Sequence, residues 1–182
     1  MINNTERNIL IAGFGGQGIV LVGNVLAYAC VNAGKNVLAM ASYGAEVRGG
    51  TAKGIIAISD EEIDSPIINI ANLALIMNTP SYVKYIETVE EGSIVVANSS
   101  MIDDELTARG DFDIVKVDAT NMALRMGNSK VANLIMLGAL IKKTGILEPE
   151  SIFNGMRRVF SKGKKGLYYI NESAFRMGFD LV

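Results

Sequence analysis

Histidine and tryptophan are absent from the 182-residue chain, and cysteine occurs once, as Cys30. Catalytic triads that contain histidine, cysteine–histidine pairs and zinc sites built from His or Cys need side chains that the chain does not have. An iron–sulfur cluster normally needs four thiolates, and an intrachain disulfide needs two. The chain therefore cannot build any of these centres by itself, and a lone cysteine fits a reducing compartment.

An excess of one charge is also missing, since 17 Lys and Arg stand against 19 Asp and Glu for a formal net charge of -2. Such a balance gives no basis for binding nucleic acid. No apolar run approaches the ~20 residues that span a bilayer, and residues 1–7 lack the basic and apolar regions of a signal peptide. We therefore expect a cytoplasmic protein whose partners include neither nucleic acid nor a membrane.

Hydrophobic residues, by contrast, make up 49% of the chain. This fraction excludes a disordered protein and allows a sizeable core. The chain length predicts one domain over residues 1–182. The apolar excess also indicates a surface that another subunit buries.

Short apolar segments alternate with segments of helical periodicity along the chain. Helices are predicted to start at Ile19, Thr79, Val131, Pro149 and near Asn171, and the helix that starts at Thr79 is predicted to run to Gly92. The alternation predicts an α/β fold, three-layer and Rossmann-like, with a largely parallel sheet and helices on both faces. The predicted strands are residues 8–12, 36–41, 51–59, 73–78, 93–97 and 113–117.

A glycine-rich segment, GFGGQG at 13–18, follows the first predicted strand and opens the first predicted helix. It matches G-x-G-x-x-G, whose glycines let a diphosphate approach the amides of a helix start. The acidic residue that binds the ribose of NAD should follow about 20 residues later, but residues 36–42 contain no Asp or Glu. NAD is therefore disfavoured. A Walker-type site is excluded, because no Lys-Ser or Lys-Thr follows the last glycine.

Two interpretations of this segment stay open. In the first, the glycines permit close packing of strand and helix or admit a loop of a partner. In the second, the loop binds an anionic cofactor through Gly15, Gly16, Gln17 and Gly18.

A second segment, SYGAEVRGGT at 42–51, combines three glycines with two opposite charges. Glu46 and Arg48 are two residues apart and point to one side of an extended chain, so they either pair with each other or bind a partner. The arginine fork suits a carboxylate or a phosphate, and adjacent glycines let another backbone approach. We expect an interface formed by Ser42, Tyr43, Gly44, Glu46, Arg48, Gly49, Gly50 and Thr51.

Taken together, GFGGQGI at 13–19 and SYGAEVRGGTA at 42–52 resemble the gamma subunit of the 2-oxoacid:ferredoxin oxidoreductases, the pyruvate/ketoisovalerate oxidoreductase gamma family. The resemblance covers nearly the whole chain, including NSKVAN at 128–133 and the segment 171–178. The form SYG-x-E-x-RGG is closer to the 2-oxoglutarate and branched-chain members than to the indolepyruvate members. The chain therefore resembles a gamma subunit of the 2-oxoglutarate type most.

This resemblance implies a subunit that is inactive alone. The whole enzyme would convert a 2-oxoacid and coenzyme A (CoA) to acyl-CoA and carbon dioxide, with ferredoxin as electron acceptor. Alpha, beta and ferredoxin-like delta subunits would be the partners, and they would hold thiamine diphosphate, Mg²⁺, the iron–sulfur clusters and CoA. This chain would supply no catalytic residue and no metal ligand. Both glycine segments would face the catalytic subunits near the CoA entry, with Arg48 against a diphosphate or a partner carboxylate.

Two other functions remain open from the residues alone. One is a stand-alone nucleotide-binding Rossmann-like oxidoreductase or regulatory module, and the other is a purely structural subunit that contacts no substrate. The basic residues Arg157, Arg158, Lys162, Lys164 and Lys165 are expected to form a solvated helix end, although they would also suit an acidic ferredoxin. Cys30 is expected to be buried.

Overall fold

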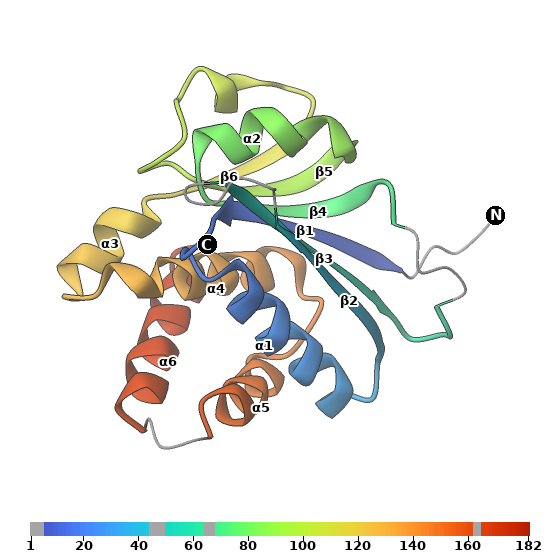
Figure 1. Ribbon diagram of the computed structural model, residues 1–182, viewed down its shortest axis with the longest axis vertical. Helices are drawn as coiled ribbons and strands as arrows, with labels where there is room; N and C mark the ends of the chain where they lie inside the picture. Colours follow the sequence, from blue (N-terminus) through green and yellow to red (C-terminus); the bar gives the residue numbers. More distant parts are fainter. Residues whose placement is uncertain (1–5, 44–49, 64–67, 162–164) are drawn as a thin grey trace.

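A mixed sheet forms the middle layer of the computed structural model, which describes residues 6–43, 50–63, 68–161 and 165–182 (Figure 1). Within these residues the sheet has six strands in the order β2-β3-β1-β4-β5-β6. The strands β1, β4, β5 and β6 run parallel to one another, whereas β3 runs antiparallel to both of its neighbours, β1 and β2. The strands are β1 (Arg7–Phe14), β2 (Asn36–Tyr43), β3 (Thr51–Ser59), β4 (Ala71–Ile76), β5 (Val89–Asn98) and β6 (Asp113–Val117).

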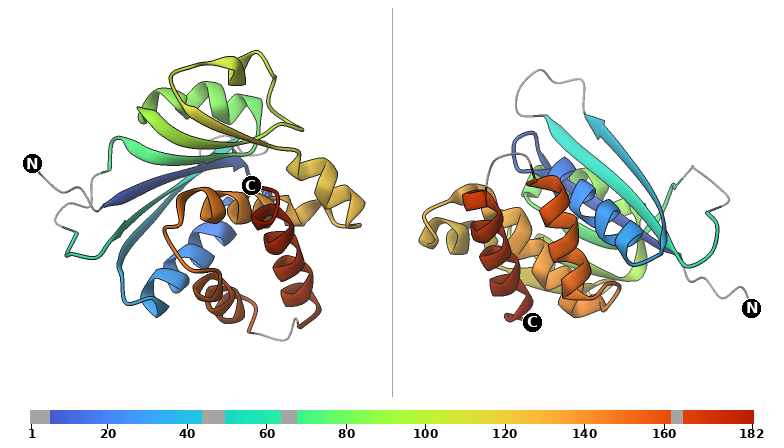
Figure 2. Two further views of the ribbon diagram at one scale, coloured as in Figure 1. Left: turned by 180° about the vertical axis from the view of Figure 1, so that it is seen from behind. Right: turned by 90° about the horizontal axis from the view of Figure 1, so that it is seen from below.

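Helices cover both faces of this sheet, which confirms the predicted three-layer α/β fold (Figures 1 and 2). On one face lie α1 (Ile19–Asn32), α4 (Ala132–Thr144), α5 (Pro149–Val159) and α6 (Lys165–Phe179). On the other face lies α2 (Thr79–Tyr85), while α3 (Ala119–Arg125) follows β6 at the end of the sheet. Three short 3₁₀ turns, η1 (Ile86–Thr88), η2 (Leu106–Ala108) and η3 (Ser129–Val131), complete the described elements.

The apolar run of β1 is explained by burial on both faces of the sheet. Ile9 and Ile11 pack with α1 and α4, whereas Leu10 and Ala12 pack with α2 on the opposite face. All four side chains are at most 1% exposed. The position of β1 between β3 and β4 therefore needs an unbroken apolar strand rather than an alternating one.

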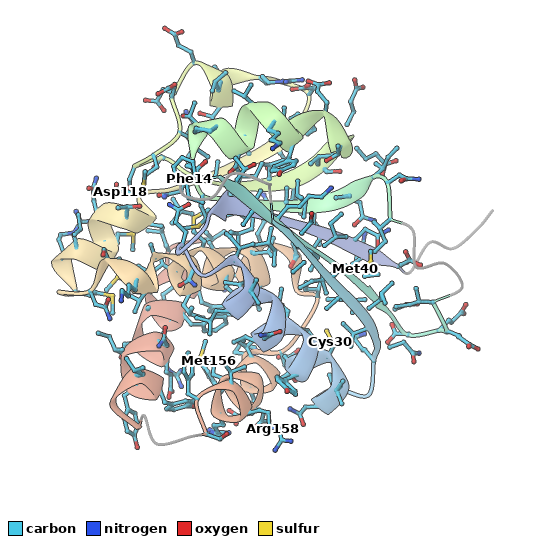
Figure 3. All side chains as sticks on the ribbon, viewed as in Figure 1. Phe14, Cys30, Met40, Asp118, Met156 and Arg158 are labelled. Carbon is cyan, nitrogen blue, oxygen red and sulfur yellow. The ribbon has the colours of Figure 1, made fainter. Side chains whose placement is uncertain are left out.

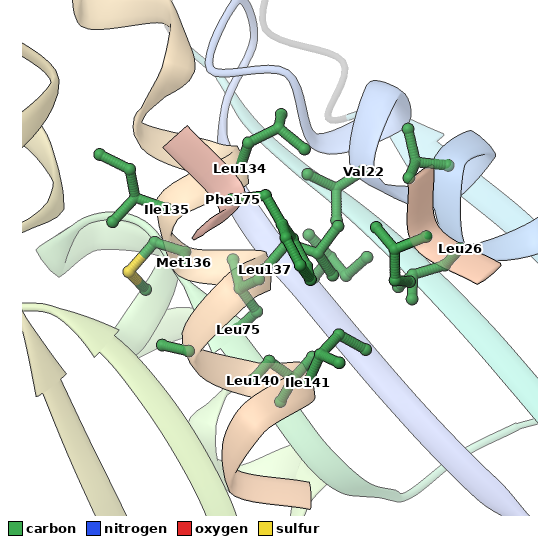
Figure 4. Packing of buried hydrophobic residues seen from close by; sticks show 14 of the residues in the cluster. Val22, Leu26, Leu75, Leu134, Ile135, Met136, Leu137, Leu140, Ile141 and Phe175 are labelled. Atoms are coloured by element: carbon green, nitrogen blue, oxygen red, sulfur yellow. The ribbon is translucent and has the colours of Figure 1, made fainter. Parts of the chain in front are cut away.

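Helix α4 lies at the centre of the larger core, and its residues from Ala132 to Ile141 are all buried. Figure 4 shows Leu134 and Leu137 beside Phe175 of α6 and Val22 of α1. Gly145, in the left-handed conformation with φ +62°, ends the helix as expected. A helix buried on every side must be apolar almost all round, and Asn133 is the one polar residue in this stretch.

The helix predicted from Thr79 to Gly92 starts at Thr79 but ends well before Gly92. It begins with Asn78 as its cap, whose Oδ1 accepts a hydrogen bond of 2.9 Å from the Ser81 amide. It ends at Tyr85, because the chain passes through η1 into β5 and Val89 pairs with Ala71 of β4. Parallel pairing of β5 with β4 therefore takes up residues that the helical periodicity had assigned to the helix.

The predicted start of the last helix near Asn171 is also wrong, since α6 begins at Lys165. Asn171 is 5% exposed, and its Nδ2 donates to the Leu167 carbonyl oxygen at 2.6 Å. An asparagine that bonds within its own helix is not a cap. Asparagine is common at helix starts, which suggested one here. In the structure the helix that packs on α4 already begins at Lys165.

Cys30 is fully buried, as expected, and burial raises the pKa of its thiol to about 12. It is therefore a poor nucleophile. Arg157 and Arg158 are exposed at the end of α5, and Arg157 donates to Glu150 at 3.0 Å. Lys162 and Lys164 lie outside the described residues. None of the described helices has the length and apolar character needed to cross a bilayer.

Candidate functional site at the carboxyl edge of the sheet

The glycine loop joins the end of β1 to the start of α1, at the edge where the parallel strands terminate. Figure 3 shows Phe14 at the end of β1 and Asp118 after β6 at this same edge. Here β1 leads to α1 on one face of the sheet and its neighbour β4 leads to α2 on the other. Open α/β sheets bind ligands at such a change of face. The fold thus places the loop where a ligand or partner site is expected.

Two glycines of this loop are required by packing within the chain. A Cβ at Gly13 would meet the side chains of Ile19 and Gln17 within 2.8 Å. A Cβ at Gly18 would overlap the amide of Asn133, and Gly18 has a positive φ of +77°. The Asn133 Nδ2 also donates to the Gly18 carbonyl oxygen at 3.2 Å, so α4 holds the end of the loop.

Gly15 and Gly16 differ, because both are exposed and a Cβ on either one would meet no other atom within 4 Å. Gly16 needs glycine for its φ of +94°, but Gly15 has no positive φ. Nothing within the described chain therefore requires glycine at residue 15. The missing side chain leaves room there for a group that the described residues do not supply.

The start of α1 adds hydrogen-bond donors to this open surface. The helix is capped by Gly18 without a side-chain acceptor, and its first turn has no acidic residue. Its amides before Val22 have no partner within the helix, because the Val22 amide is the one that bonds Gly18. They attract an anion with roughly 0.3–2 kcal/mol, whereas micromolar binding needs about 8 kcal/mol. The loop is therefore one part of a site that needs further contacts.

Gln17 is occupied within the chain. Its Oε1 accepts hydrogen bonds of 2.7 Å from both the Phe14 amide and the Asn78 Nδ2. Asn78 in turn caps α2. Gln17 is predicted to contact a cofactor, but these hydrogen bonds give it an alternative, structural role. Its side chain joins the glycine loop to Asn78, between β4 and α2.

A cleft of about 220 Å³ opens beside Gly16 and Gln17. Its walls come from five parts of the chain and include Met77, Met101, Thr120 and Lys130. Lys130 is exposed and is the one cation among the residues that line this cleft. The cleft therefore extends the uncapped helix start with one further positive charge.

Asn98 and Asp118, which sequence reasoning missed, brace the wall of this cleft. Asn98 is fully buried, and its Nδ2 donates to the Met77 carbonyl oxygen at 3.0 Å and to Thr120 Oγ1 at 2.9 Å. Asp118 accepts from Ser100 Oγ at 2.6 Å, and this hydroxyl, with Asn121 and Arg125, lowers the pKa of the Asp118 carboxyl. An Asn at the end of a buried strand, as at residue 98, or shortly after one, as at residue 78, was the available signal.

The second glycine segment contacts the first through Gly50, which is one of its described residues. The Gly15 amide donates to the Gly50 carbonyl oxygen at 3.3 Å. Ser42 is exposed at the end of β2, Tyr43 is the last residue of that strand, and Thr51 is buried at the start of β3. The predicted interface residues Gly44, Glu46, Arg48 and Gly49 lie outside the described residues.

The fold and the site define a class of protein: an α/β layered protein with a mixed sheet that offers backbone amides, rather than reactive side chains, at its open loop. A family model described as pyruvate ferredoxin/flavodoxin oxidoreductase matches residues 8–181. The chain therefore belongs to that family, as a gamma-type subunit of a 2-oxoacid:ferredoxin oxidoreductase. The resemblance seen in the two glycine segments is confirmed.

Relatives and solved structures agree with this assignment. The 2-oxoglutarate synthase subunit KorC of Archaeoglobus fulgidus is 36% identical over 177 residues, which are 97% of this chain and 88% of KorC. The ketoisovalerate oxidoreductase subunit VorA of Methanothermobacter marburgensis is 33% identical over 96% of this chain but only 36% of VorA. The gamma subunit of a keto/oxoacid ferredoxin oxidoreductase from Geobacter sulfurreducens matches with a TM-score of 0.77, 28% identity and 96% coverage of both chains.

A longer protein contains the same fold. The 2-oxoglutarate:ferredoxin oxidoreductase from Magnetococcus marinus matches 97% of this chain and 31% of its own chain, with a TM-score of 0.87 and 24% identity. The architecture therefore occurs both as a separate polypeptide and as part of a larger one.

Proposed function

We propose that the chain is the gamma subunit of an enzyme that converts 2-oxoglutarate and CoA to succinyl-CoA and carbon dioxide and passes the electrons to ferredoxin. The relative with 36% identity is a 2-oxoglutarate synthase subunit, and the Magnetococcus marinus structure holds 2-oxoglutarate, CoA and succinyl-CoA. The partners are the alpha and beta subunits and a ferredoxin-like delta subunit, in the cytoplasm. The chain has no activity without them.

One observation carries the role of this chain within the enzyme: the loop at Gly15 and Gly16 leaves space that the described chain does not fill. Beside it lie the uncapped amides of α1 and the exposed amine of Lys130. This combination suits a phosphate group of CoA at the entry to the catalytic subunits, or a backbone of one of those subunits. Arg48 is the further residue that we assign to a diphosphate or a partner carboxylate.

The redox and metal chemistry belongs to the other subunits in this proposal. An iron–sulfur cluster needs more thiolates than the one buried Cys30 provides. Within the described ranges, no group of three or more His, Cys, Asp or Glu side chains converges as metal ligands do. In this proposal thiamine diphosphate, Mg²⁺ and the clusters are assigned to the other subunits, and this chain contributes surface and hydrogen bonds.

The proposal is tested by purifying the native complex and assaying CoA-dependent reduction of ferredoxin with several 2-oxoacids. We expect 2-oxoglutarate to be the preferred acid and the isolated chain to be inactive. Tight binding of NAD(P) or another nucleotide by the isolated chain, without any thiamine-dependent partner, would support a stand-alone module instead. Preference for a branched-chain 2-oxoacid would contradict the substrate while leaving the subunit role intact.

A substitution at Gly15 separates the partner-facing role from a structural one. Gly15→Val should leave the stability of the isolated chain within about 0.5 kcal/mol, because the site is open and has no positive φ. In the complex it should raise the apparent KM for CoA, or the Kd for the other subunits, about tenfold. The two readouts are measured by chemical unfolding of the chain and by kinetics and titration of the complex.

Gly110→Val is the matched control, since Gly110 is also exposed, open around its Cβ position and free of a positive φ. It lies before β6, away from the glycine loop, and should change neither readout. A raised KM with normal assembly would assign the loop to CoA, whereas weaker assembly with a normal KM would assign it to a partner subunit. Wild-type values for both would remove the proposed role of the loop.

A further inference from the structure

Two lysines flank a single tyrosine ring on the face of the sheet that carries α2. The amines of Lys53 in β3 and Lys84 in α2 lie 5.6 Å and 5.5 Å from the centroid of the Tyr85 ring. Lys84 Nζ also donates to Thr51 Oγ1 at 2.9 Å, and the Tyr85 hydroxyl lies 3.1 Å from the same oxygen. Thr51 is only 7% exposed, so a buried hydroxyl holds the Lys84 amine in place. We refer to Lys53 and Lys84 as the lysine pair.

The lysine pair has no acidic partner among the residues that the structure describes. All eight salt bridges found there involve other cations. The aromatic ring attracts both ammonium groups through its face, but it does not balance their charge. A local surplus of positive charge in a chain of net charge -2 is complementary to a carboxylate or phosphate from elsewhere.

An uncharged edge strand lies next to the lysine pair. Strand β2 is outermost in the sheet, and its sequence NVLAMASY contains neither a charge nor a proline. The register sets Ser42 opposite Lys53 and Met40 opposite Ile55, so these four side chains share one face. Met40, labelled on β2 in Figure 3, is 40% exposed. An edge without charge or proline is free to pair with another strand.

Helix α2 leaves this face of β2 open. In Figure 1 α2 lies over the middle of the sheet, and the strands that it contacts most are β1 and β3. Met40 and Ser42 on β2 and the lysine pair therefore lie on one continuous surface. This surface reaches the same end of the sheet as Gly15, because Thr51 pairs with Phe14 in the last register position of β1.

We propose that this surface is the docking site for an extended segment of another subunit of the enzyme. The segment pairs with β2 and then crosses the face of β3, where it sets an Asp or Glu side chain between Lys53 and Lys84. Main-chain hydrogen bonds to the free edge give affinity, and the charge at the lysine pair sets the register. The identity of the partner rests on the proposed function, whereas the acidic, extended character of the segment follows from this surface.

The test uses a double variant, Lys53→Gln with Lys84→Gln, mixed with the remainder of the enzyme from which this subunit has been removed. We expect the Kd for this remainder to rise about tenfold or more at low salt, and its salt dependence to flatten, because the charge attraction is lost. Lys116→Gln with Lys142→Gln is the control, since it removes the same charge from β6, at the opposite edge of the sheet, and from α4. This control should bind as the wild type does.

Two further measurements keep the proposal falsifiable if the double variant folds poorly. Lys53→Arg with Lys84→Arg retains the charge and should restore most of the binding. Carbodiimide cross-linking of the wild-type complex should join Lys53 or Lys84 to an Asp or Glu of another subunit. Unchanged affinity and salt dependence in the glutamine variant, or cross-links to this chain alone, would overturn the docking site. If no other subunit co-purifies with the wild type, the proposed function itself has failed.

Discussion

Replacement of Gly178 by alanine is expected to lower the free energy of unfolding by about 3 kcal/mol. A Cβ at Gly178 in α6 would overlap the backbone carbonyl of Ile135 in α4, and a Cβ at Gly138 in α4 would overlap the carbonyl oxygen of Phe175 in α6. The two helices therefore touch backbone to backbone, each through a glycine of its own. Unlike a flexible side chain, a helix backbone moves only as a whole, so the helices would have to separate and lose contacts along their length.

Urea unfolding of the isolated chain measures this effect, and Gly166→Ala provides the matched control. Gly166 lies in the same helix, is exposed and has open space around its Cβ position. The alanine there should be neutral or stabilising by up to about 1 kcal/mol, because alanine is the better helix former. Equal stability of the Gly178→Ala variant and the wild type would show that α4 and α6 do not cross as closely as described.

Replacement of Asn98 by alanine is expected to cost about 2–3 kcal/mol of stability. The fully buried Asn98 satisfies the Met77 carbonyl oxygen, Thr120 Oγ1 and, through its own Oδ1, the Thr120 amide at 3.3 Å. Alanine would leave the carbonyl of the buried Met77, just after β4, and the half-buried Thr120, in α3, without these partners. The Thr120 amide should lose protection in hydrogen exchange, which localises the damage to the wall of the cleft.

Asn121→Ala is the control for this prediction. Asn121 is exposed, and its Nδ2 donates to Asp118 at 2.7 Å where water can take its place. We expect a change of about 0.5 kcal/mol or less. If both variants lost a similar free energy of unfolding, the buried hydrogen bonds of Asn98 would add no more stability than the exposed hydrogen bond of Asn121.

These two predictions concern two parts of the structure that support the glycine loop and the cleft beside it. The contact of α4 with α6 stabilises the helical layer, and α4 in turn holds the glycine loop through Asn133. The Asn98 network joins the ends of β4 and β5 to α3, beside the cleft next to Gly16. The open surface at Gly15 and Gly16 thus lies on a rigid support, which is what a site needs when its remaining contacts come from another molecule.

The sequence by itself determined which chemistry is impossible and which layers form. Absent histidine and a single cysteine excluded several reaction centres, because no fold creates a missing side chain. Apolar runs alternating with helical periodicity predicted the three layers and most of the strands, because burial on both faces leaves a strong local pattern. The two glycine segments led to the family.

Only the tertiary structure decided which glycines are fixed by packing within the described chain and which have open space around them. Gly13 and Gly18 are set by Gln17, Ile19 and Asn133, whereas Gly15 meets nothing, and G-x-G-x-x-G does not distinguish them. The antiparallel direction of β3, the Asn98 network and the lysine pair likewise join residues far apart in the sequence. Such contacts depend on how complete elements pack, and local periodicity carries no information about that packing.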